Sequence, residues 1–334
     1  MKSVEVINDR RHLSKIMLFV FLMSIVIFAG KLIAFLITKS DSVFSDALES
    51  IANILASGFG LFGVYYSGKP KDETHPYGHG KIEYLASGFE GALILFASVT
   101  ILLKAAHSLF YVKPLEEINT GIYIIFATSL LNFIVGFWLV RTGLKKGSTI
   151  LHADGKHLIS DGVTSIGIIV GLWLVSFTGY KIIDPMMAIL LGVFTFYTGF
   201  KLLKSAMDNL MDKADYSRLD ALSVNLQNIR KDQWIDIHNL RILNYGNAAH
   251  IDCHMTLPLF FTVDQSSKEV AIIEAELKKI WKNELELFIH VDPCVPGEMC
   301  KHCRFKACIV RKNEFKDQIK WNTKTLLEGD WQEL

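Results

Sequence analysis

Polar and charged side chains recur at helical spacing inside two apolar stretches of this sequence. Glu49 and Asn53 are four residues apart in one stretch, and His157 and Asp161 are four apart at the start of another. Residues four apart lie on one face of a helix, so each stretch presents a polar pair to one side. A charge within a bilayer costs roughly 2.5–3.5 kcal/mol on insertion scales, so such pairs usually mark function.

The two pairs together would form a four-ligand cage for a first-row divalent metal ion. One imidazole, two carboxylates and an amide oxygen suit such an ion, and the carboxylates neutralise its charge. The alternative is that these residues make helix-end contacts near the headgroups or hydrogen bonds between helices. Asp46 shares the face of Glu49, and we expect it to cap the helix or line the path of the ion rather than bind it.

These pairs require helices that cross a membrane. Of the 334 residues, 51% are hydrophobic, and they gather in the first two thirds of the chain. A helix that crosses the lipid bilayer needs about 20 apolar residues, and six runs in this sequence are long enough. The runs are 18–36, 43–66, 84–111, 121–140, 158–177 and 183–203. The first run is too long for a cleavable signal and ends without a convincing cleavage site, so we expect it to be retained.

Lysine and arginine predict the orientation of these helices in a cell membrane. They are frequent before the first run and in the loops after the second and fourth, at Lys2, Arg10, Arg11, Lys15, Lys69, Lys71, Lys81, Arg141, Lys145, Lys146 and Lys156. The opposite loops carry one each, at Lys39, Lys113 and Lys181. The positive-inside rule therefore predicts that both termini are cytoplasmic.

The composition changes to that of a soluble domain after about residue 212. Helical spacing and strand alternation predict the order αββαβ, with a turn at Gly246-Asn247 between the first two strands. The predicted ranges are 216–229, 235–243, 250–257, 268–282 and 285–291. This order is typical of a small ferredoxin-like α+β domain with its helices on one face of the sheet.

The chain therefore divides into three predicted parts. They are a membrane α-helical domain of six helices over 1–212, a cytoplasmic α+β domain over 213–293, and a Cys-rich segment with a polar, poorly ordered end over 294–334.

Four of the five cysteines fall in one short segment, with the spacing C-x5-C-x2-C-x4-C. They are Cys294, Cys300, Cys303 and Cys308. Structural disulfides are rare in the cytosol, whereas C-x2-C is a common metal spacing, so a four-thiolate zinc site or an iron–sulfur cluster would fit. Lys301, Arg304 and Lys306 are expected to lower the pKa values of these thiols. The alternative is spare thiols, and Cys253 is predicted to be a small core residue.

The sequence resembles the cation diffusion facilitator family of divalent metal transporters over nearly all of residues 10–293. Four motifs carry the resemblance in the family's order. They are SDALESIAN at 45–53, HPYGHGK at 75–81, ADGKHLISD at 153–161 and HVDP at 290–293. The resemblance implies a homodimer of six-helix protomers, each exchanging a cytoplasmic divalent ion, often zinc, for protons. It also implies a transport site, formed by Glu49, Asn53, His157 and Asp161.

Two positions depart from the family pattern. Asn53 stands where Asp is most common, and Glu49 stands where His or Asp is usual. An amide is a neutral ligand that does not titrate, which leaves the ion open. Zinc is our first expectation, with iron(II) or manganese close behind and cobalt and cadmium possible. Because protons compete with the ion for its ligands, His157, with an unperturbed pKa near about 6.5, is the expected proton carrier.

The resemblance also implies accessory sites. One is a second metal site in the loop at Asp72, His75 and His79, where Pro76 and Gly78 shape a turn; the alternative is a purely structural turn. Another is a metal site between the two cytoplasmic domains of a dimer, whose implied ligands are His238, His254, His290 and Asp292, against the alternative of solvated polar strand faces. His250 is its weakest candidate. A salt bridge near the dimer interface is implied between Lys81 and Asp212.

Other classes of function have less support. The net charge is +1 and there is no basic stripe, so nucleic-acid binding is not expected. No GxxxxGK[ST] loop is present, which argues against an ATP-driven pump, and nothing favours an enzyme. A membrane metal sensor would not need ligands inside the bilayer. An iron–sulfur redox protein would need haem or quinone features that the helices lack.

Overall fold

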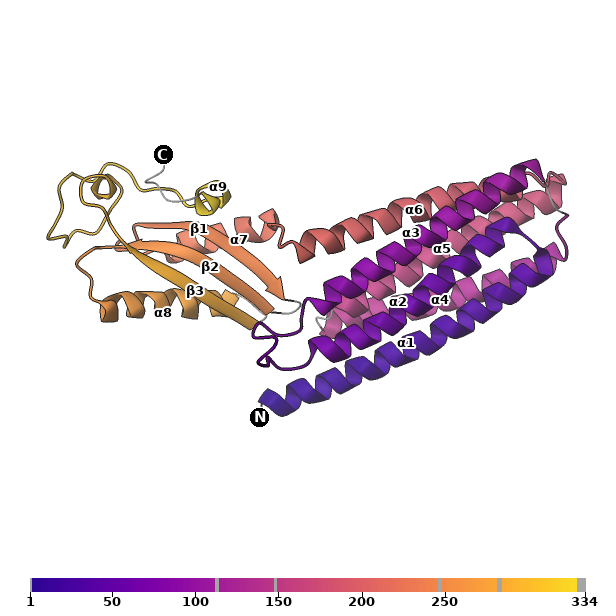
Figure 1. Cartoon of the computed structure of the whole chain (residues 1–334), viewed down its shortest axis with the longest axis horizontal. Coiled ribbons are helices and arrows are strands. Elements are labelled where there is room, and N and C mark those ends of the chain that lie inside the picture. Colours follow the sequence, from indigo (N-terminus) through magenta and orange to yellow (C-terminus); the bar gives the residue numbers. More distant parts are fainter. Residues whose placement is uncertain (1, 112–113, 147–148, 246–247, 281–283, 329–334) are drawn as a thin grey trace. The chain divides into compact units, whose positions relative to one another are not determined.

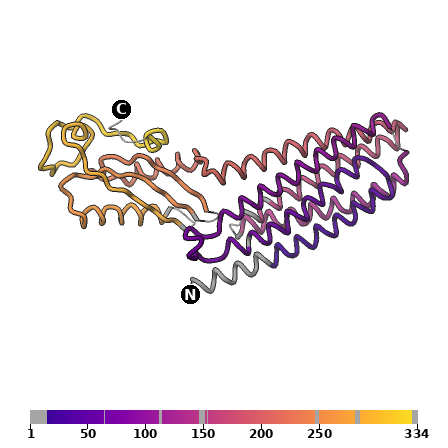
Figure 2. Tube along the Cα trace, in the orientation of Figure 1, coloured from indigo at the N-terminus to yellow at the C-terminus, as the bar shows by residue number. Residues whose placement is uncertain are grey.

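The computed structural model divides the chain into two compact units, which Figure 2 traces in sequence order. The residues it describes are 2–111, 114–146, 149–245, 248–280 and 284–328. The first unit contains Met1–Pro70 and Ile82–Asp208, and the second contains Lys71–Lys81 and Asn209–Leu334. The loop at 71–81 and the segment after residue 293 thus belong to the same unit as the α+β domain, which differs from the predicted three-part division.

The first unit is built from long helices (Figure 1), and six helices among the described residues are long and apolar enough to cross a membrane. Their bounds are α1 (Lys2–Thr38), α2 (Asp41–Ser67), α3 (Ile82–Phe110), α4 (Ile118–Lys146), α5 (Thr149–Thr178) and α6 (Ile183–Leu210). Each predicted apolar run coincides with one of them, so the predicted six-helix fold is confirmed. α5 begins eight residues before His157, so the expectation that His157 opens this helix was wrong. The first turns of α5 are polar, and a search for apolar runs does not include them.

Small residues allow these helices to approach each other closely. A Cβ atom at Gly155 of α5 would lie 2.7 Å from the backbone nitrogen of Val140 and 2.8 Å from the carbonyl oxygen of Gly136, both on α4. A Cβ at Gly91 of α3 would similarly lie 2.7 Å from the backbone nitrogen of Leu203 on α6. Glycine at such positions is typical of membrane helices, which pack through close backbone contact.

Asp184 at the start of α6 holds the turn between α1 and α2 through hydrogen bonds. Its carboxylate accepts hydrogen bonds from the Ser40 hydroxyl at 2.6 Å and the Asp41 backbone N–H at 2.6 Å, and also from Ser42. Ser40 in turn caps α2 by accepting the N–H of Val43. These hydrogen bonds satisfy backbone donors at the α2 N-terminus that a helix end otherwise leaves unpaired.

The second unit contains a three-stranded sheet in the order β1-β2-β3 (Figure 1). The strands are β1 (Asp236–Tyr245), β2 (Ala248–Leu257) and β3 (Glu284–Pro293), with β1 antiparallel and β3 parallel to β2. Helices α7 (Tyr216–Ile229) and α8 (Val263–Ile280) share one hydrophobic core with the sheet, through residues that include Leu219, Leu226, Met255 and Ile273. The predicted αββαβ order is confirmed, while the predicted turn at Gly246-Asn247 lies outside the described residues.

The start of α8 and the polar end of the chain differ from the predictions because side chains fix them. α8 begins at Val263 rather than 268, because Thr262 and Gln265 cap it through reciprocal hydrogen bonds of 2.9 and 3.3 Å between backbone N–H groups and side-chain oxygens. The polar end of the chain also packs rather than standing loose. Trp321 is 2% exposed, and the Arg230 guanidinium lies 3.8 Å from its ring centroid. A short helix, α9 (Thr323–Leu327), follows.

The α4–α5 contact predicts a specific sensitivity to one methyl group. Gly155→Ala places that methyl against backbone atoms that cannot move aside, and overpacking of this kind costs about 1–3 kcal/mol. We expect a lower melting temperature in detergent for this variant. Gly167→Ala, on the same helix, is the matched control because its Cβ would meet only Leu191 Cδ2, at 4.0 Å. Equal melting temperatures for the two variants would contradict the close packing of α4 on α5.

Candidate functional site

The polar pairs of α2 and α5 meet inside the helical unit. The Asn53 amide nitrogen donates to Asp161 Oδ2 at 2.5 Å, and His157 Nε2 lies 2.9 Å from Asn53 Oδ1. An amide oxygen only accepts hydrogen bonds, so His157 Nε2 carries the proton in this arrangement. Asn53 therefore links the imidazole to the carboxylate, whose Oδ1 is itself 3.8 Å from His157 Nε2.

Glu49 completes the set from one turn earlier on α2. Its half-buried carboxylate interacts electrostatically with Asp161 and His157. Asp161 is 3% and Asn53 is 7% exposed, so the group lies within the protein rather than at its surface. Two carboxylates, one imidazole and one amide oxygen are a donor set that can replace the water shell of a divalent ion.

Lys31 is a buried charge that the sequence analysis overlooked. Its Nζ lies 2.7 Å from Asp46 Oδ1, both side chains are 1% exposed, and the Ser165 hydroxyl donates to Asp46 at 3.0 Å. Asp46 is thus held in an ion pair and does not cap α2, whose N-cap is Ser40, so that part of the prediction was wrong. A lysine within the apolar run at 18–36 was the available signal, since such charges rarely occur without a partner.

Two further acidic side chains lie near the ligand set. Glu90 on α3 and Asp154 on α5 both interact electrostatically with His157, and Glu90 also with Asp161. Neither was selected from the sequence, although Glu90 is an acid within an apolar run. Both are acids close enough to the ligand set to act on it electrostatically.

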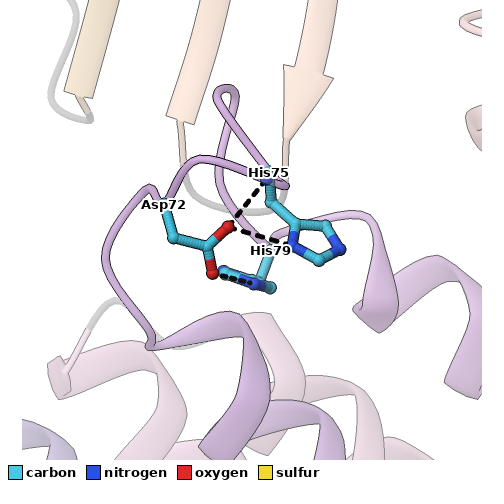
Figure 3. A group of neighbouring side chains, drawn as sticks. All are labelled: Asp72, His75 and His79. Atoms are coloured by element: carbon cyan, nitrogen blue, oxygen red, sulfur yellow. Dashed lines mark hydrogen bonds and ion pairs between the residues drawn. The ribbon is translucent and has the colours of Figure 1, made fainter.

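The loop residues Asp72, His75 and His79 converge in the second unit (Figure 3). The backbone N–H of His75 donates to Asp72 at 2.7 Å, the His79 Nε2 atom is 3.4 Å from the other carboxylate oxygen, and the two imidazole centroids are 4.3 Å apart. One ligand atom from each residue lies within 4.8 Å of the others. Hydrogen bonds from Thr74 and His75 hold the pKa of Asp72 at about 2, so this carboxylate is ionised at physiological pH.

Three histidines form a row across the sheet. His238 pairs with His254 between β1 and β2, and His254 pairs with His290 between β2 and β3. Asp292 lies beside all three, at 2.9 Å from His254 Nδ1, 3.3 Å from His290 Nε2 and 3.7 Å from His238 Nε2. Ligand atoms of His238, His254 and Asp292 lie within 4.8 Å of one another, whereas His290 is more exposed. Asp236, 3.0 Å from His238 Nδ1, orients that ring toward Asp292.

The remaining predicted residues fall in different places. Lys81 and Asp212 form the expected ion pair at 2.9 Å. His250 lies apart from the histidine row and stacks on Phe288, with centroids 4.6 Å apart. Cys253 is a buried core residue as predicted, and burial raises the pKa of its thiol to about 12.

The cysteine segment is largely buried, and the basic residue that acts on its thiols is not one of those predicted. Cys294, Cys300 and Cys303 are buried and Cys308 is half-buried. Arg304 points to Asp232, at 3.7 Å, and the cation that acts on Cys300 and Cys303 is Arg311. Burial raises the pKa values of Cys294 and Cys303, so the expectation that Lys301, Arg304 and Lys306 lower the thiol pKa values is wrong for these two cysteines.

Two family models match this chain. A family model described as the cation efflux transmembrane domain matches residues 17–211, and one described as the cation efflux protein, cytoplasmic domain, matches residues 220–294. Together they cover the helical unit and the sheet domain.

Several relatives match along most of their length. An uncharacterized transporter of Synechocystis is 33% identical, over 74% of this chain and 80% of that protein. The cation-efflux pump FieF of Yersinia pestis is 28% identical, over 81% of this chain and 90% of that protein. The manganese efflux system protein MneP of Bacillus subtilis is 25% identical, over 86% of this chain and 98% of that protein.

The buried Lys31–Asp46 pair predicts non-additive effects on stability. Lys31→Met leaves Asp46 buried and unpaired, and breaking a buried pair in this way costs about 3–5 kcal/mol. Lys31→Met combined with Asp46→Leu removes both charges and is expected to recover most of the loss. Melting temperatures of the two single variants and the double variant in detergent measure this. A double variant no more stable than Lys31→Met would contradict the pairing.

Proposed function

We propose that this chain, which belongs to the cation efflux, or cation diffusion facilitator, family of divalent metal transporters, exports a first-row divalent ion from the cytoplasm in exchange for protons. The observation that carries the proposal is the link from His157 through the Asn53 amide to Asp161 inside the membrane-spanning unit. With Glu49 these residues form the proposed transport site.

The proposed exchange follows from the protonation of the ligands. A metal ion requires His157 to offer an unprotonated nitrogen and Asp161 and Glu49 to be carboxylates. The imidazole nitrogen that now bonds Asn53 carries a proton, and it must lose that proton before it binds an ion. Protons that return to these groups would release the ion, so metal and protons occupy the site alternately. His157 is the proposed principal carrier.

The ion itself is proposed from the donor set. One nitrogen and three oxygens can hold zinc in a tetrahedron, which keeps zinc as the first candidate. Iron(II) and manganese tolerate oxygen-rich surroundings, and a relative of similar length carries manganese efflux in its name, which supports these ions as the second candidate.

The direction of transport rests on the orientation proposed for the helices. An even number of spans would put both termini on one side. The excess of lysine and arginine in the first half of α1, after α2 and where α4 meets α5 supports the cytoplasm as that side. The sheet domain is then cytoplasmic, and we propose that it joins two copies of the chain as a homodimer.

The two clusters of the second unit are proposed as regulatory metal sites. The loop group around Asp72 and the row around Asp292 each offer three ligand atoms within 4.8 Å, including two imidazoles and one carboxylate. This donor set fits a zinc-class ion. Occupied sites would stabilise the domain when cytoplasmic metal is abundant, because an ion that binds only the folded form adds to its stability.

Proteoliposome transport tests the proposed site. The wild type is expected to take up metal under a pH gradient, whereas Asp161→Ala removes a charged ligand and should abolish saturable uptake. Zinc, iron(II), manganese, cobalt and cadmium are compared side by side. Asp208→Ala, at an acid on α6 outside the ligand set, is the matched control and should retain uptake.

Asn53→Asp gives a separate test of how the amide affects selectivity. It adds a third carboxylate to the ligand set, so we expect altered preference among these ions or more protons exchanged per ion. Unchanged selectivity and stoichiometry would contradict this role for Asn53. If no ion were transported while the second unit still bound metal, a sensor function would replace the proposed one.

A further inference from the structure

The segment that follows β3 holds four cysteines in a largely irregular fold. Between residues 294 and 311 its one regular element is the 3-10 turn η1 (Met299–Lys301). Its apolar support is a small cluster that joins Ile235 and Met299 to Cys294 and Cys303. A segment with so small a core usually needs an additional covalent or metal link to hold one conformation.

Backbone amides surround the sulfur atoms of this segment. Cys300 Sγ accepts N–H groups from Gly297 at 3.5 Å and from Lys312 at 3.4 Å. Leu259 donates its backbone N–H to Cys294 in the same way. Phe305, two residues after Cys303, donates to that thiol. Burial still raises the pKa values of Cys294 and Cys303, so these amide donors would stabilise charged sulfur only once a metal ion has displaced the thiol protons.

Arg311 folds the chain around the C-x2-C pair. Its guanidinium donates to the carbonyl oxygens of Cys300 at 3.2 Å, Cys303 at 2.9 Å and Phe305 at 2.9 Å. The Asn313 side chain closes the opposite side by donating to the Gly297 carbonyl at 2.6 Å. These hydrogen bonds hold Cys300 and Cys303 in one folded turn and place the positive charge of Arg311 beside the two cysteines.

We propose that Cys294, Cys300, Cys303 and Cys308 bind one thiophilic divalent ion of the zinc class, as a structural site that is distinct from the transport site. Binding would release the thiol protons and leave four thiolates around the ion. The amide donors and Arg311 would then stabilise the negative charge that the complex carries.

A single ion fits the segment better than an iron–sulfur cluster. The side chains of Ile235 and Met299 pack against Cys294 and Cys303, and inorganic sulfide would have to displace them. The two groups of three ligand atoms within 4.8 Å in the described part of the chain contain no cysteine, so the sulfurs must draw closer on binding. Cys308 is the least buried of the four, so we expect it to make most of that movement.

Cadmium titration of the full-length protein tests the site independently of transport. Cadmium bound to thiolates gives a charge-transfer absorption in the near ultraviolet, which the histidine and carboxylate sites cannot produce. The wild type is expected to saturate this band at one ion per chain. Cys253→Ala is the control, because Cys253 is the one cysteine outside the segment, and it should leave the band intact.

Cys308→Ser should weaken cadmium binding by more than about tenfold, the scale seen even for loss of an outer-shell partner. Because Cys308 is half-buried, this variant is expected to keep its fold, and an unchanged melting temperature of the metal-free protein checks that. Equal affinity in Cys308→Ser and the wild type, or no charge-transfer band in the wild type, would overturn the proposal. Acid-labile sulfide with visible absorption in protein isolated without oxygen would overturn it in favour of a cluster.

Discussion

A charge inside the membrane needs an opposite charge or hydrogen-bonding groups beside it, and this requirement determines how α1, α2 and α5 are placed. Lys31 of α1 neutralises Asp46 of α2, and Ser165 of α5 completes the shell of that carboxylate. One or two turns away, Asn53 of α2 satisfies Asp161 of α5. The two polar layers fix the register of three helices, because sliding any one of them would leave a buried charge unpaired.

The ligands of the proposed transport site are divided between α2 and α5, which pack mainly on other helices. Asp161 lies on α5, whose backbone approaches that of α4 at Gly155 and Gly136, whereas Asn53 lies on α2, which packs on α1 and α3. The close backbone contact between α4 and α5 behaves as rigid, because packed interiors hardly deform. Any relative movement of α2 and α5 therefore changes the distances among the ligands. Alternating access needs such a coupling between helix movement and affinity for the ion.

The sequence predicted what depends on local periodicity, and it missed what depends on contacts between distant segments. Six apolar runs, the αββαβ order and the polar pairs four residues apart all follow from spacing within one element. The partner of Lys31 and the position of Trp321 depend on other elements, and neither leaves a periodic signal. The early start of α5 was missed because its first turns are polar. The cap of α8 was also missed, although Thr262 and Gln265 form a local pattern that could have shown it.

Asn53 has a consequence for charge that a carboxylate at this position would not have. The Lys31–Asp46 pair is neutral as a unit, so Glu49 and Asp161 are left to balance the cargo. With a neutral imidazole and a neutral amide, those two carboxylates and a divalent ion sum to zero net charge, and a neutral complex has the smallest desolvation cost at membrane depth. A third carboxylate would leave an excess negative charge that only a proton or a rearranged Lys31 could offset. The amide thus allows the loaded site to be neutral without a bound proton.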